Sequence, residues 1–100
     1  MYRFTRTVTA KNAGAMVAGL QFAAGVAAYL NKKYSLNMKY GAELFGTPTL
    51  HWHFESDSVD KMLQINAKLM QDKEYVALLD KHKEGWVPGS LKDTLVALGD

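Results

Sequence analysis

Apolar and polar residues alternate along residues 49–55, which read Thr-Leu-His-Trp-His-Phe-Glu. Successive side chains of a β-strand point to opposite faces, so Leu50, Trp52 and Phe54 share one face. The two histidines and Glu55 share the other. Further segments alternate in the same way or combine aromatic and β-branched residues between turns. The pattern predicts four strands, at residues 2–9, 36–44, 49–55 and 91–98.

Helical spacing marks the two segments between these strands. Asn12 is a suitable cap for a long helix that runs to about Tyr34. A second helix follows residues 56–58, which read Ser-Asp-Ser; residues 71–73 interrupt it, and a further short helix ends near Gly85. The apolar stripe of the first helix comprises Met16, Leu20, Ala23, Ala27, Leu30 and Tyr34, and one face of the last holds Tyr75, Leu78, Leu79 and His82.

The order of strand, helix, two strands, a helix pair and a final strand is the βαββαβ order of ferredoxin-like α+β domains. We expect residues 1–100 to form one such domain, with an antiparallel four-stranded sheet that carries its helices on one face. The helix-facing residues would be Leu36, Met38, Tyr40, Leu50, Trp52 and Phe54, joined by Tyr2, Phe4 and Val8. The bare face would carry Arg3, Thr5, Thr7, Lys39, Gly41, Glu43, His51, His53 and Glu55.

The alternating strand around Trp52 ends in an acidic residue and a serine, Glu55-Ser56. After the helix that follows, the residues Asp72-Lys73-Glu74-Tyr75 begin another helix, which contains Leu78-Leu79. These features, within residues 46–86, resemble the second half of NIPSNAP-like dimeric α/β-barrel proteins. Lys73 stands where that family often has Pro, and the first half agrees only in layout. The resemblance implies a homodimer in which two sheets pack face to face and enclose a barrel.

One face of the first helix carries small residues where a solvated face would normally carry Lys and Glu. It holds Gly14, Ala18, Gln21, Gly25 and Ala28. An interior Gly costs about 1 kcal/mol against Ala, so we interpret this face as packed closely against another element or a second chain. The alternative is an exposed, Ala-rich face in a compact monomer.

The formal net charge is only +2 and the basic residues are dispersed, so nucleic acid is not the expected partner. Residues 13–30 are uncharged and approach the length of a membrane span. Ala and Gly dominate them, however, and we expect no membrane association. The lack of cysteine excludes disulfides and thiolate chemistry and agrees with a reducing compartment. With no signal peptide visible, we expect a cytoplasmic protein.

Two histidines of the bare face are the candidates for acid/base chemistry. An imidazole has an ordinary pKa of about 6.5, so His51 and His53 can exchange protons near neutrality. Arg3 and Lys39 could orient an anionic or enolate-like ligand, and the candidate ligand-binding residues are Arg3, Lys39, Glu43 and Glu55. The alternative is a pair of histidines that only hydrogen-bond to neighbouring strands.

The same two imidazoles also suit Zn²⁺ or Fe²⁺. Three alternate strand positions span about 13 Å, which places Glu55 too far away. A third ligand would have to come from Glu43, His82 or the other subunit, and we expect no metal. Related dimeric barrels include haem-degrading monooxygenases, but the position of their haem-ligating His falls on Leu79. The resemblance therefore argues against haem, we expect no cofactor, and we interpret His82 as a helix-end residue favoured by the helix dipole.

Two functions follow from these observations. One is a small homodimeric barrel of unassigned role that binds a small organic molecule in a polar and aromatic cavity. The alternative is a cofactor-independent monooxygenase or isomerase of the antibiotic-biosynthesis type, with His51 or His53 as the base on a phenolic or keto substrate. Whether the chain is an enzyme stays open at this point.

Overall fold

A computed structural model of the chain describes residues 1–43 and 45–99. The elements follow in the order β1 (Tyr2–Thr9), α1 (Ala13–Tyr34), β2 (Lys39–Ala42), β3 (Thr49–Ser56), α2 (Val59–Met70), α3 (Lys73–Asp80), the 3-10 turn η1 (Lys83–Gly85) and β4 (Lys92–Ala97). The predicted α+β order is confirmed. Gly85 ends η1 rather than α3. Leu44, at the predicted end of the second strand, and Asp100 lie outside the described residues.

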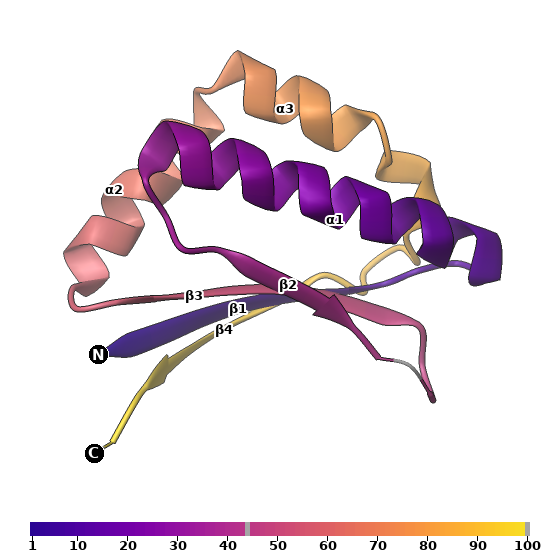
Figure 1. Ribbon diagram of the computed structural model, residues 1–100, viewed down its shortest axis with the longest axis horizontal. Helices are drawn as coiled ribbons and strands as arrows, with labels where there is room; N and C mark the ends of the chain where they lie inside the picture. Colours follow the sequence, from indigo (N-terminus) through magenta and orange to yellow (C-terminus); the bar gives the residue numbers. More distant parts are fainter. Residues whose placement is uncertain (44, 100) are drawn as a thin grey trace.

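The four strands form one antiparallel sheet in the order β2-β3-β1-β4. Helices α1, α2 and α3 lie on one side of this sheet, and no helix formed by the described residues lies on the other (Figure 1). The central strands β1 and β3 are paired so that Phe4 lies opposite Phe54 and Val8 opposite Leu50. These side chains face the helices, and the alternate positions of both strands therefore face away from them.

β2 is shorter than predicted and begins at Lys39. The Asn31 side chain on α1 accepts a hydrogen bond from the Met38 backbone N–H at 2.7 Å and donates one to the Met38 carbonyl at 3.1 Å. Because these bonds occupy both the backbone N–H and the carbonyl of Met38, that residue does not join the hydrogen-bond ladder between β2 and β3. Its side chain still lies in the core, on the predicted face.

The core lies between α1 and the centre of the sheet. Leu50 is fully buried, and Trp52 donates a hydrogen bond from Nε1 to the Ala23 carbonyl at 3.2 Å. α1 comes closest to the sheet at Gly19, where a Cβ would lie 2.6 Å from Leu50 Cδ1. The helix therefore turns Gly19 toward the sheet, and the predicted burial of Leu20 is wrong, since 38% of that residue is exposed.

By length and composition alone α1 could cross a membrane, with a mean hydropathy of 1.5. A core helix passes the same test, and α1 packs on the sheet through Ala23, Val26, Ala27 and Leu30. The small-residue face of α1 is exposed at Gly14, Ala18, Gln21, Gly25 and Ala28. No element among residues 1–43 and 45–99 therefore covers this face, and its contact with a second chain stays a prediction.

A buried carboxylate joins α1 to α3. Asp72 caps α3, with its Oδ1 accepting a hydrogen bond from the Tyr75 N–H at 3.1 Å. It also accepts hydrogen bonds from the Tyr34 hydroxyl at 2.6 Å, the Tyr29 hydroxyl at 2.7 Å and the Lys33 ammonium at 3.0 Å. These bonds, with that from Tyr34 the strongest, hold the pKa of Asp72 well below its usual value. The charged form of Asp72 is therefore part of the fold.

We expect Asp72→Asn to destabilise the protein at pH 7 and to weaken its acid sensitivity. A carboxyl whose pKa is lowered in the folded state contributes stability above its unfolded pKa of about 3.9, and this stability is lost as the pH falls through the folded value. Urea unfolding at pH 7 and at pH 3 measures both effects. Asp60→Asn, an exposed position of α2, is the matched control. Equal pH dependence in the wild type and Asp72→Asn would contradict this role.

Candidate functional site

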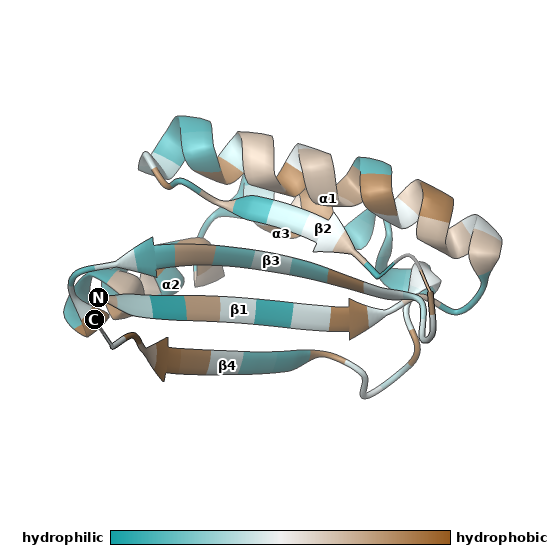
Figure 2. Ribbon diagram, turned by 60° about the horizontal axis from the view of Figure 1, so that its bottom comes forward, coloured by the Kyte–Doolittle hydropathy of each residue, from teal (hydrophilic) through white to brown (hydrophobic). Residues whose placement is uncertain are grey.

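The open side of the sheet is mostly polar. Figure 2 shows hydrophilic and hydrophobic positions alternating along β3 and β1, whereas β4 changes from hydrophilic at its start to hydrophobic at its end. In the register, His51 lies opposite Thr7, His53 opposite Thr5, and Glu55 opposite Arg3. β2 places Gly41 and Lys39 beside the two histidines, and β4 adds Lys92, Thr94 and Val96. Side chains distant in sequence are therefore neighbours on one surface.

The two imidazoles lie one above the other. Their ring centroids are 5.5 Å apart and their planes differ by 30°. The His51 ring leans over the backbone of β2 at Gly41, where a Cβ would lie 2.9 Å from its Cε1 atom. A larger residue at this position would push the ring away, so Gly41 leaves open the space that the His51 ring occupies beside His53.

The surroundings of His53 favour its neutral imidazole. Partial burial lowers the pKa of His53, and the neighbouring His51, Arg3 and Lys39 lower it further. Glu55 opposes this effect only weakly, because it also pairs with Arg3, with a distance of 3.4 Å between Glu55 Oε1 and an Arg3 guanidinium nitrogen. At neutral pH His53 is therefore able to accept a proton.

A shallow depression of about 350 Å³ lies over this part of the sheet, and its lining residues are Arg3, Thr5, Thr7, His51 and His53. Three of the predicted site residues thus meet in one place. Lys39 and Glu55 border it through their register partners. Glu43 lies apart, beyond β2, where its backbone N–H bonds to the Thr49 carbonyl.

Thr5 and Thr7 were not among the predicted ligand-binding residues, although they line the depression. Their position could be inferred from sequence, because they alternate with Phe4 and Val8 and share a face with Arg3. What the sequence lacked was the register that places them opposite the histidines.

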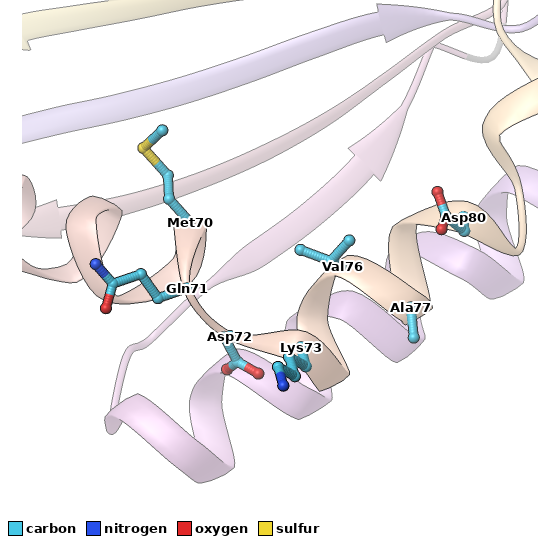
Figure 3. Close-up of a pocket in the computed structure, with 7 residues that line it drawn as sticks. All are labelled: Met70, Gln71, Asp72, Lys73, Val76, Ala77 and Asp80. Carbon is cyan, nitrogen blue, oxygen red and sulfur yellow. The ribbon is translucent and has the colours of Figure 1, made fainter.

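A larger hollow, of about 430 Å³, lies at the elbow between α2 and α3. Figure 3 shows Met70 and Val76 on one side of this elbow and Asp72 turned toward α1. The Asp72 carboxylate is already bonded to α1 and to the start of α3. The other residues that line the hollow are exposed. We therefore assign no functional site to this hollow.

His82 lies on the helix side of the sheet, beyond the end of α3 at Asp80. Its ring stacks on Phe22 with 5.4 Å between centroids and meets Trp86 edge-on at 4.5 Å. His82 does follow the end of α3, with its backbone N–H bonded to the Leu79 carbonyl, and aromatic packing holds its ring. From this side of the sheet it cannot join the two histidines of the open face. Among residues 1–43 and 45–99, no three His, Cys, Asp or Glu side chains are grouped so that they could hold a metal ion.

The fold and the polar open face define a ferredoxin-like domain of the kind found in dimeric α/β-barrel proteins. No known family model matches the chain, and no curated protein sequence matches it. Solved structures do match it. A NIPSNAP family protein of unknown function from Agrobacterium tumefaciens superposes with a TM-score of 0.78, at 21% identity over 96% of this chain and 86% of that one.

Two further structures extend the comparison. A dimeric ferredoxin-like protein from an uncultured marine organism gives a TM-score of 0.74, at 15% identity over 99% of this chain and 89% of that one. SnoaB, a cofactor-independent oxygenase from Streptomyces nogalater, gives 0.71, at 10% identity over 99% of this chain and 93% of that one. Identities this low show a shared fold. The predicted resemblance to NIPSNAP-like proteins is confirmed at that level.

Proposed function

We propose that two copies of this chain pack their open sheet faces together and bind a small organic molecule in the polar cavity enclosed between them. The depression lined by Arg3 and the two histidines carries the proposal, because no helix in the described part of the chain, residues 1–43 and 45–99, covers the face on which it lies. Pairing would turn a shallow surface into an enclosed site, which is the kind of site that small molecules favour.

The open face combines features that suit both the pairing of two copies and the binding of a ligand. Thr5, Thr94 and Val96 are small or apolar enough for close packing of two sheets, which lie about 10 Å apart when they stack. Arg3 and Lys39 supply charge at its border. The dimeric ferredoxin-like structure with the same fold supports pairing of two copies.

A second function is favoured by one observation: the lowered pKa of His53 keeps an imidazole neutral beside two cations. A neutral imidazole can take a proton from a phenol or from the carbon next to a ketone, and Arg3 and Lys39 would stabilise the enolate or phenolate that forms. SnoaB, with the same fold, is a cofactor-independent oxygenase. The alternative function is therefore an oxygenase or isomerase that uses a histidine base.

Separate His51→Ala and His53→Ala variants distinguish the two functions. Ligands are first found by screening small organic acids, phenols and ketones for an increase in the unfolding temperature. In a binding protein, each variant should weaken the binding of such a ligand about tenfold or more and leave folding unchanged. In an enzyme, one variant should lower turnover of a screened compound by about 100-fold or more. If both variants bind every ligand as the wild type does, the proposed site is wrong.

A further inference from the structure

We propose that the open-face site takes an anionic ligand, of the carboxylate or enolate class, together with one proton held by the His51–His53 pair. This inference rests on the proposed function and adds the chemical class of the ligand. It also adds a property that a plain binding site lacks, which is the coupling of ligand binding to proton uptake.

The arrangement of the two rings is the first argument. With their centroids 5.5 Å apart, two protonated imidazoles would repel each other, so a proton on one ring disfavours a proton on the other. Gly41 leaves room for the His51 ring in this place, since a side chain at position 41 would clash with it. The close approach of the two rings therefore depends on the glycine.

The charges that face the pair are the second argument. They come from all four strands: Arg3 on β1, Lys39 on β2, Glu55 on β3 and Lys92 on β4, with Glu43 beyond the end of β2. Burial and the neighbouring His51 lower the pKa of His53 most, and the cations Arg3 and Lys39 lower it further. An anion seated in the depression would offset these cations and attract an imidazolium. Binding of the anion and of the proton therefore strengthen each other.

The lining of the depression is the third argument. It is rich in hydrogen-bond donors: the Arg3 guanidinium, the Thr5 hydroxyl and the N–H groups of the imidazoles. The single bond of Arg3 to Glu55, at 3.4 Å, leaves further guanidinium donors for a ligand. Donors of this kind match carboxylate or enolate oxygens.

Benzoate is a suitable probe, with benzamide as its neutral analogue. Isothermal titration at pH 6, 7 and 8, in two cationic buffers of different ionisation enthalpy, measures the affinity and the number of protons taken up. We expect benzoate to bind about tenfold more weakly at pH 8 than at pH 7, with close to one proton taken up per ligand. Benzamide should bind at least tenfold more weakly at pH 7 and take up no proton.

Three variants locate the effect. His53→Gln should remove most of the pH dependence, and Gly41→Ala should reduce proton uptake while both histidines remain. Lys68→Gln, on the exposed surface of α2, should behave as the wild type. In the wild type alone, NMR titration of the histidine ring protons should show a higher imidazole pKa when benzoate is present, a result that depends on no variant folding.

Benzoate binding without proton uptake, equal binding of benzamide, or no binding of benzoate would each overturn this inference. None of these results bears on the pairing of two copies. Different results would contradict the proposed function. These are a monomeric protein in solution, or ligands that bind both histidine variants with the same affinity as the wild type.

Discussion

Replacing Leu50 by Ala is expected to lower the free energy of unfolding by about 3 to 5 kcal/mol. Leu50 is fully buried between α1 and the sheet, with its Cδ1 against Gly19. The backbone of α1 is already as close to the sheet as Gly19 allows, and the Trp86 ring lies beside the same glycine. The surroundings therefore have little freedom to fill the cavity left by the smaller side chain, which puts the cost in the upper part of the usual range.

Leu63→Ala is the matched control for this variant. The same atoms are removed, but Leu63 lies on α2 with 61% of its surface exposed. Its effect should stay within about 0.5 kcal/mol. Urea unfolding of the two variants and the wild type measures the difference. Equal losses for Leu50→Ala and Leu63→Ala would contradict the placement of the core between α1 and β3.

The second large effect is expected from Thr5→Arg, which places a charge at the centre of the open face. Thr5 lies opposite His53 on one side and Thr94 on the other. If two such faces are pressed together, each copy would bury an unpaired guanidinium near Arg3, at a cost of about 3 kcal/mol or more. The dissociation constant of the dimer should therefore rise by about 100-fold or more. Sedimentation velocity over a range of protein concentrations measures this change.

A matched control separates the open face from the outside of the helix layer. Val17→Arg adds the same side chain to α1 at a position that is 63% exposed, away from the open face. It should leave the dimer intact, and both variants should remain folded by circular dichroism, because neither change disturbs the core. Dissociation by Val17→Arg with no effect of Thr5→Arg would show that copies pair through α1 instead.

The fold was predictable because its main elements have local signals. Trp52 and its neighbours alternate strictly, and Asn12 caps α1 as expected. An interruption does separate two helices, although it covers residues 71–72 and Lys73 already begins α3. The alternation of apolar and polar residues also predicted which side chains lie on each face of the sheet, because successive side chains of a strand point to opposite faces. The candidate site residues were drawn from one face for this reason, and three of them meet in the depression.

What could not be predicted depends on contacts between distant residues. The bonds from Asn31 to Met38 shorten β2, and nothing in the alternation of residues 36–44 indicates them. Gly19 rather than Leu20 faces the sheet because Leu50 and Trp86 fill the space beside it. The role of Asp72 likewise requires that Tyr29 and Tyr34 on α1 come within reach of α3.

The central claim is that two copies hide their histidine-bearing faces from water by packing them together. Light scattering of the purified protein, coupled to size-exclusion chromatography, tests this claim most directly. We expect a mass of about twice the 11.1 kDa of one chain. A mass close to 11.1 kDa at all accessible concentrations would contradict it, because the depression around His51 and His53 would then stay open to solvent.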